Sequence, residues 1–90
     1  MKFLHYEYNI GPEDSVVVEL NSQANVFFLD DSNFSNYKAG RAYNYYGGRA
    51  KKSPVYLSPP HRGHWNLVID LGGYGGNVNA SVRLNKAHYA

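Results

Sequence analysis

A strict two-residue alternation near the C-terminus most constrains what this chain can fold into. The segment HWNLVIDL, residues 64–71, places an apolar side chain at every second position from Trp65, and VNASVRL, residues 78–84, alternates without a fault. Successive side chains of a β-strand point to opposite faces of its sheet, so this period of two predicts strands with one buried face. The glycine-rich GGYGG between the segments predicts a hairpin in the core of the fold.

The alternation also predicts which side chains of this hairpin lie inside the fold. The opposite face of the first strand carries Asn66, Val68 and Asp70, which we expect to point outward. The apolar set should share a core, because one-face alternation on adjoining strands needs one. We therefore expect burial of Trp65, Leu67, Ile69, Val78, Val82 and Leu84.

Shorter segments of the same character precede the hairpin. An alternating segment lies on each side of the breaker GPED. The apolar run VFFLD predicts a strand that is covered on both faces or lies under a loop. The dipeptide Gly47-Gly48 predicts a tight hairpin turn, since glycine adopts the positive φ angles that such turns need. The strands predicted in this part of the chain are residues 2–9, 15–20, 26–30, 42–46, 49–53 and 54–58.

One short helical turn is the expected exception. Asp31 or Ser32 is suited to cap a turn that sets Phe34 and Tyr37 on one side and stops at Gly40. The later PPHRG predicts a rigid turn, and the sequence leaves open whether the bonds preceding its two prolines, Pro59 and Pro60, are cis.

About seven short strands separated by Gly, Pro and Asn turns predict an all-β fold. We expect an antiparallel β-sandwich, or a barrel- or prism-like variant, with at most one short helical turn near residues 32–38. The aromatic fraction of 16% suits pleated sheets. At 90 residues, the chain has room for a single domain, residues 1–90.

The composition also bounds the cellular setting. The chain has no cysteine, which excludes disulfides and cysteine-based zinc sites. The first residues show no basic region followed by an apolar one, and no run of about 18 apolar residues could cross a bilayer, so we expect neither a signal peptide nor a membrane span. We therefore expect a soluble cytoplasmic protein without membrane contact.

Charge is sorted along the chain, although the net charge is only +2. Six of the seven acidic residues lie in the first 31 positions, and no acid lies between Ser32 and Ile69. The tyrosine-rich YNYYGGRAKKSP, residues 43–54, falls in this acid-free part, and its alternation leaves at least one tyrosine outside the core. Tyrosine rings beside cations are typical of contact surfaces. The alternative is an edge strand that its lysines protect from aggregation.

The predicted contact surface combines this stretch with nearby aromatic and basic residues. Its candidate residues are Tyr37, Arg41, Tyr45, Tyr46, Arg49, Lys51, Lys52, His61, Arg62 and His64.

Acid–base and metal chemistry find little support in the sequence. His61 and His64 lie three residues apart, but on a turn and a strand start rather than on a helix face. A lone carboxylate such as Asp70 more often caps the N–H groups of a turn than acts as a general base. The glycine doublets lack the following helix N-terminus that phosphate-binding loops need. We expect no enzyme activity, no bound metal and no cofactor.

The order of motifs resembles a bacterial family, domain of unknown function 1883. The resemblance is carried by FLDDSNFSNYKAGRAYNYYGG, KKSP and GHWNLVIDLGGYGGNVNASVRL, and it runs over nearly the whole chain. It implies a small all-β domain that occurs alone or joined to a Toll/interleukin-1 receptor (TIR) domain. Bacterial TIR domains are often NAD-consuming effectors of antiphage defence, which implies a sensing, docking or regulatory role for a companion domain.

Two function classes remain open at this point. The first is a non-enzymatic binding or regulatory module that recognises a protein partner or a small anionic ligand through its Tyr, Arg and Lys side chains. The second is a nucleic-acid-binding domain that uses the same cations on phosphates and the tyrosines on bases. The low net charge and the lack of a known nucleic-acid-binding motif speak against the second class.

Overall fold

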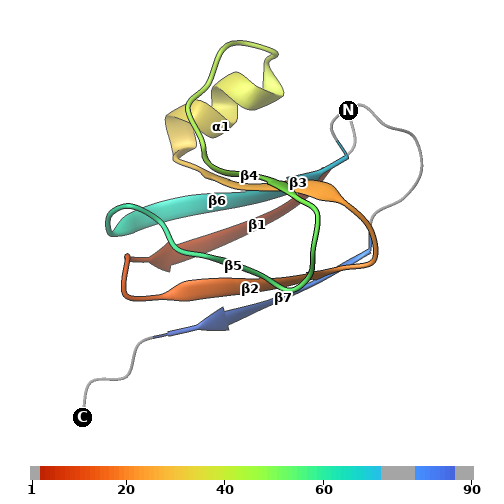
Figure 1. Ribbon diagram of the computed structural model, residues 1–90. Helices are drawn as coiled ribbons and strands as arrows, with labels where there is room; N and C mark the ends of the chain where they lie inside the picture. The colour runs from red at the N-terminus through yellow and green to blue at the C-terminus, as the bar shows by residue number, and fades with distance from the viewer. Residues whose placement is uncertain (1–2, 72–78, 87–90) are drawn as a thin grey trace.

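Two antiparallel sheets pack face to face, and one helix covers the outer face of the larger sheet (Figure 1). The computed structural model describes residues 3–71 and 79–86. Its elements are β1 (Phe3–Ile10), β2 (Ser15–Leu20), β3 (Ala24–Leu29), α1 (Asp31–Lys38), β4 (Tyr46–Ala50), β5 (Val55–Leu57), β6 (Gly63–Asp70) and β7 (Ala80–Asn85). The predicted all-β sandwich with one short helix is confirmed, and the described strands form open sheets instead of a closed barrel.

The larger sheet has the strand order β1-β6-β3-β4, and the smaller has the order β5-β2-β7. The core between them contains the predicted Trp65, Leu67 and Ile69, each at most 1% exposed. Val82 and Leu84 are partly buried against this core, while Val78 lies outside the described residues. The alternation therefore identified the core face of both strands.

The predicted hairpin between residues 64–71 and 78–84 is wrong. β6 pairs with β1 and β3, whereas β7 pairs with β2 in the other sheet. The GGYGG segment lies outside the described residues. An alternation of period two determines which face of a strand is apolar but not which strand it pairs with, because two strands can face one core from opposite sheets.

The predicted turn at Gly47-Gly48 is also wrong, because both glycines lie inside β4. Gly47 pairs with Phe27 and Gly48 with Val26 of β3. Gly47 has a φ of 133°, and a Cβ atom there would lie 2.4 Å from the carbonyl oxygen of Val26. Glycine at position 47 therefore permits a close approach of two strands instead of a reversal of the chain.

The helix is longer than the single turn predicted and begins with a different cap. α1 has eight residues, and its N-cap is Asp30, whose carboxylate accepts a 2.8 Å hydrogen bond from the Asn33 backbone N–H. Phe34 and Tyr37 are buried one turn apart, as predicted. The helix ends before Gly40, which has a φ of 75°.

A second, smaller apolar cluster lies between α1 and the outer face of the larger sheet. It contains Phe27, Leu29, Phe34, Tyr37 and Val68. β3 and β6 are thus covered on both faces, and the residues of β6 expected to point outward are buried under α1 and the segment that follows it. The exposure of this face was predicted wrongly because the helix that covers it is short and mostly polar in sequence.

One proline bond is cis, and no described helix could span a membrane. The cis peptide bond found among the described residues joins Ser53 to Pro54, not the bonds at Pro59 or Pro60 that the sequence left open. Within the same residues, the helix is too short and too polar to cross a membrane.

Candidate functional site

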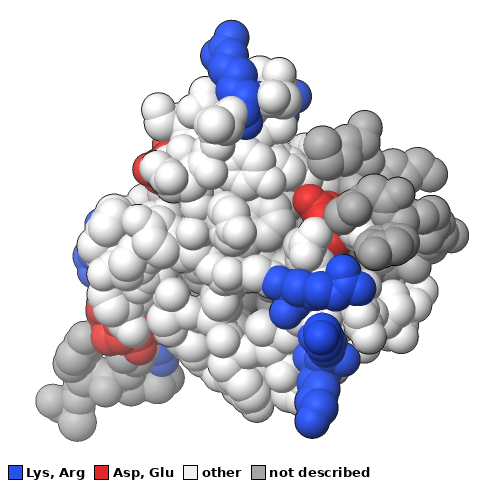
Figure 2. Space-filling model, turned by 45° about the horizontal axis from the view of Figure 1, so that its top comes forward, with Lys and Arg blue, Asp and Glu red and all other residues white. Residues whose placement is uncertain are grey.

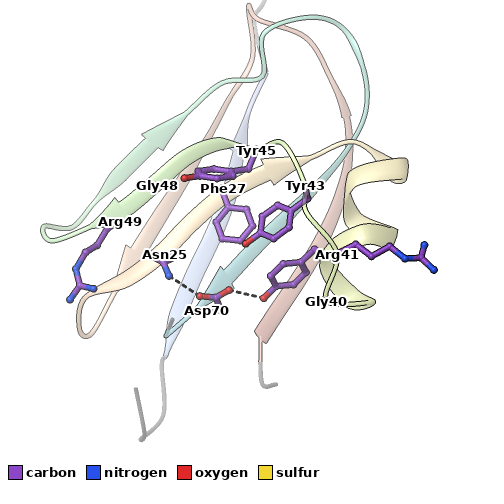
Figure 3. Close-up of a pocket in the computed structure, with 10 residues that line it drawn as sticks. Asn25, Phe27, Gly40, Arg41, Tyr43, Tyr45, Gly48, Arg49 and Asp70 are labelled. Carbon is purple, nitrogen blue, oxygen red and sulfur yellow. Dashed lines mark hydrogen bonds between the residues drawn. The ribbon is translucent and has the colours of Figure 1, made fainter. Parts of the chain in front are cut away.

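A pocket of about 630 Å³ lies on the outer face of the larger sheet, beside α1 (Figure 3). Strands β3, β4 and β6 form its floor, and the segment 40–45 between α1 and β4 forms one side. Its lining residues are the aromatic Phe27, Tyr37, Tyr43 and Tyr45, the polar Asn25 and Asp70, the basic Arg41 and Arg49, and the glycines Gly40 and Gly48. We call this the aromatic pocket.

Local structure explains how the chain presents these side chains. In β3, Val26 and Phe28 enter the core of the sandwich, so Asn25 and Phe27 point to the opposite face and into the pocket. Beyond the helix, the Asn44 backbone N–H donates a 2.8 Å hydrogen bond to the side chain of Asn33, which ties the connecting segment to α1. The segment therefore runs across the sheet with its tyrosines against Phe27.

The aromatic rings of the pocket form one continuous wall. The centroid of the Phe27 ring lies 6.2 Å from that of Tyr43 and 5.5 Å from that of Tyr45. Tyr43 lies 5.8 Å from Tyr45 and 5.2 Å from Tyr37. Tyr37 is buried, whereas Tyr45 is 53% exposed. The wall is thus held from behind and offers one largely open ring to a ligand.

The floor of the pocket holds the only acidic residue of the chain beyond Asp31. Asp70 is 5% exposed, and its carboxylate accepts a 2.6 Å hydrogen bond from the Tyr37 hydroxyl and a 2.9 Å bond from the Asn25 amide. Hydrogen bonds of this kind compensate the cost of burying a carboxylate. Asp70 therefore serves as a fixed polar floor below the ring wall.

The same arrangement disfavours ionisation of two tyrosines of the pocket, Tyr37 and Tyr43. Burial, followed by the hydrogen bond to Asp70 and its charge, raises the pKa of Tyr37 well above the usual value. Burial also raises the pKa of Tyr43, with smaller contributions from Asp70 and Tyr45. The single proton of the Tyr37 hydroxyl is donated to Asp70, so this hydroxyl can offer a ligand only its acceptor lone pairs.

Two arginines stand at opposite ends of the pocket. Arg49, on β4, donates a 2.8 Å hydrogen bond from Nη2 to the side chain of Gln23. Arg41 follows the end of α1, and its guanidinium extends away from the ring wall (Figure 3). Both side chains are exposed, so the charged part of the pocket is its rim and the aromatic part its centre.

The structure brings four of the ten predicted contact residues into this pocket, namely Tyr37, Arg41, Tyr45 and Arg49. Tyr46, 44% exposed, points to the other face of the sheet, where its ring packs edge-on against Trp65. His61 lies against the same indole, with ring centroids 4.9 Å apart, and its backbone carbonyl accepts a hydrogen bond from the Trp65 N–H.

The other candidates contact acidic residues or belong to another cavity. Arg62 forms ion pairs with Glu13 and, at 3.6 Å, with Asp14. Lys51 and Lys52 line a second cavity of about 220 Å³ next to the turn between β2 and β3. Figure 2 shows the basic side chains of one face in separate groups, divided by a broad uncharged surface.

His64 lies between two carboxylates at the N-terminal end of α1. Its Nδ1 is 2.8 Å from Asp31, and its Nε2 is 3.2 Å from Glu7. A hydrogen bond from Asn66, together with the one from His64, lowers the pKa of Asp31. Among the described residues, no group of three or more His, Cys, Asp or Glu side chains could hold a metal ion.

Sequence reasoning did not select Asn25, Phe27, Tyr43 or Asp70 as site residues, although all four line the pocket. The alternation of residues 43–54 predicts at least one tyrosine outside the core, and Tyr45 and Tyr46 are 53% and 44% exposed. The polarity of Asn25 next to an apolar run was a second usable signal. The meeting of β3 with β6, which joins Asn25 to Asp70, had no signal in the sequence.

The comparisons with known proteins identify a family but no activity. The chain matches the family described as Domain of unknown function (DUF1883) over residues 1–88, and it therefore belongs to this family. Comparison with curated proteins and with solved structures gives no significant match.

Proposed function

We propose that this member of the DUF1883 family is a non-enzymatic binding module that takes a small anionic ligand into the aromatic pocket. The observation that carries the proposal is the pocket itself, an aromatic wall with one open tyrosine ring and an arginine at each end. Ligand pockets commonly have volumes of roughly 300–1,000 Å³, apolar walls and a few placed polar groups. The volume of about 630 Å³ fits this range.

The charges around the pocket support an anion as the ligand. The two arginines lie at the rim and are exposed to solvent, whereas the one carboxylate lies on the floor and accepts hydrogen bonds from Tyr37 and Asn25. A guanidinium offers two parallel N–H donors that match carboxylate and phosphate oxygens. An approaching anion therefore meets the cations first, and the charge of the buried acid below is stabilised by its two neutral donors.

The distribution of cations favours a small ligand over a nucleic-acid strand. A strand binds along a continuous track of cations that releases counterions, which makes its affinity fall steeply with salt. Here Arg62 and His64 face carboxylates, and Lys51 and Lys52 line a different cavity. A nucleic-acid-binding activity is the alternative that the salt dependence of binding separates from the proposal.

The test is a titration of the protein with phenyl phosphate and benzoate, two anions that carry a planar ring, followed by amide NMR shifts. We expect shifts confined to the lining of the pocket, namely β3, β4, the segment 40–45, and the positions of Tyr37 and Asp70. Tyr45→Ala should weaken binding, since stacking on a ring contributes about 1–3 kcal/mol. Tyr56→Ala is the matched control, because this ring is 64% exposed on the other sheet. Equal losses in both variants, or no binding at all, would contradict the proposal.

The resemblance to domains that accompany TIR domains supports a regulatory role for ligand binding. We infer a cytoplasmic bacterial protein in which an occupied pocket regulates a TIR effector of antiphage defence. The measurement is the NAD consumption of a TIR protein encoded beside this gene, with and without the chain. A neighbouring TIR protein whose activity is the same in both cases would refute the regulatory role and leave ligand binding to be judged by the titration.

A further inference from the structure

We propose that the ligand of the aromatic pocket is a mononucleotide, with its base stacked on Tyr45 and its phosphate held by an arginine of the rim. This inference rests on the proposed function and names the chemical class of the ligand. Three features of the pocket support it, namely an open ring in front of a ring wall, a floor of hydrogen-bonding groups, and cations at the two ends.

The first feature selects a planar ring. Tyr45 is 53% exposed, and behind it the rings of Phe27 and Tyr43 lie within 5.8 Å, centroid to centroid. A tyrosine supported in this way loses little freedom when a ligand stacks on it. Every nucleobase has a π-face that stacks on such a ring. An anion without a ring, such as phosphate alone, would leave the wall exposed to water and gain only the contact at the rim.

The second feature selects a ring with polar edges over a plain hydrocarbon ring. The floor carries the Asp70 carboxylate, the Asn25 amide and the Tyr37 hydroxyl, joined by hydrogen bonds of 2.6 and 2.9 Å. The Tyr43 ring packs edge-on against that of Tyr37, with ring centroids 5.2 Å apart, and Tyr43 adds a further hydroxyl to the lining of the pocket. Bases and riboses carry donors and acceptors along their edges. A phenyl ring carries no donor or acceptor on its edge. It would displace water from the polar groups of the floor without replacing the hydrogen bonds that water makes to them.

The third feature places the charge of the ligand away from the ring. Arg41 lies in the segment that follows the C-terminal end of α1, and Arg49 lies on β4. The two residues line the pocket on either side of the tyrosines (Figure 3). A nucleoside monophosphate has the same layout, with the base at one end and the phosphate at the other. A nucleotide whose base lies on Tyr45 therefore brings its phosphate toward one end of the pocket. The Arg41 guanidinium extends away from the ring wall and that of Arg49 donates to Gln23, so the exposed arginine side chain at that end turns toward the phosphate and holds two of its oxygens.

The experiment is a calorimetric titration of the intact protein with adenosine 5′-monophosphate (AMP), adenosine, ribose 5-phosphate and phenyl phosphate. We expect AMP to bind tightest, and removal of either the base or the phosphate should weaken binding by about tenfold or more. Repeating the titration with the guanosine, cytidine and uridine monophosphates tests whether one base is preferred, and binding of any of the four nucleotides satisfies the proposal.

Variants assign the two ends of the nucleotide. Tyr45→Ala should weaken AMP by about tenfold, and Tyr56→Ala should leave it unchanged. Of Arg41→Gln and Arg49→Gln, at least one should weaken AMP without changing the affinity for adenosine. Circular dichroism of each variant establishes that it is folded. All four side chains are exposed, so these replacements leave the core intact.

The outcomes separate this inference from the proposed function. Tyr45-dependent binding of phenyl phosphate without binding of any nucleotide would overturn the inference and leave the proposed function standing. Binding of none of the anions would overturn both. Binding of a ten-residue oligothymidylate far more tightly than thymidine monophosphate, with a steep salt dependence, would show that a strand is recognised and would also overturn the inference.

Discussion

Tyr37 links the helix to the floor of the aromatic pocket, and its hydroxyl provides a test of how the pocket is held. The hydroxyl donates a 2.6 Å hydrogen bond to Asp70, a carboxylate that is 5% exposed. A hydrogen bond to a charged group contributes about 1.5–3 kcal/mol, and loss of one partner leaves the other less well solvated. We expect Tyr37→Phe to lower the free energy of unfolding by about 2 kcal/mol at pH 7.

This loss is large for a domain of 90 residues, whose stability is about 5–13 kcal/mol at the usual value per residue. It corresponds to a fall in Tm of about 8–16 °C. The measurement is urea and thermal unfolding of the two proteins, with Tyr56→Phe as the control because that ring is 64% exposed. A change below about 0.5 kcal/mol at pH 7 would refute the reasoning, since the bond would then be no better than a bond to water.

The pH dependence adds an independent criterion. The pKa of Tyr37 is raised in the folded protein, mainly by burial and then by Asp70. A group with a raised pKa contributes its stability below the pKa of the unfolded chain, about 10 for tyrosine, and loses it as the pH rises above that value. Stability should therefore fall above pH 10. Tyr37→Phe should make this fall shallower, and Tyr43, whose pKa is also raised, should account for part of what remains. An unchanged slope would contradict the assignment to Tyr37.

Three further predictions concern the fold around the pocket. Gly47→Ala should lower the free energy of unfolding by about 1–3 kcal/mol, because a Cβ atom there would meet the Val26 carbonyl oxygen at 2.4 Å. Gly63→Ala is the control in the same urea unfolding experiment and should be close to neutral, because the nearest atom to its Cβ would lie at 3.9 Å. Trp65→Ala should cost about 3–5 kcal/mol, since the indole is 1% exposed, and a variant as stable as the parent would show that the core is misassigned. Asp31 has a lowered pKa, so its contribution to stability is present above the usual pKa of about 3.9 and is lost as the pH falls through the pKa of the folded state. Asp31→Asn should therefore flatten the loss of stability in acid, measured as Tm from pH 7 to pH 2, and an unchanged slope would contradict this role.

The sequence predicted which face of a strand is buried better than it predicted which strands pair with each other. Alternation identified the core side of β6 and β7 because the side-chain period of a strand depends only on its own backbone. It assigned the two strands to one hairpin, whereas they lie in different sheets. Pairing depends on which strand is buried at the centre of a sheet, and β6 is buried on both faces only because α1 covers the second one. A helix of eight residues with six polar side chains gave little sign of this role.

The candidate site was predicted in part for the same reason. Tyr45, Arg41 and Arg49 lie within nine residues of one another, so the composition of one segment was enough to select them. Asn25 and Asp70 are 45 residues apart and meet only through the pairing of β3 with β6. Residue type indicates what chemistry a segment can contribute, but the joining of distant segments follows from tertiary structure.

The way the pocket is built also determines which replacements can report on function. One face of β3 and of β6 packs in the core, and the other face lies at the pocket. Phe27 and Asp70, which are 4% and 5% exposed, therefore contribute both to folding and to the pocket. A loss of binding after their replacement would not distinguish a damaged pocket from a damaged fold. Tyr45 and the two arginines lie on exposed positions after the helix and along the edge strand β4. Their replacement removes the proposed ligand contacts while both apolar clusters keep their buried members, so binding measured on variants of these three residues is the decisive test of the proposed function.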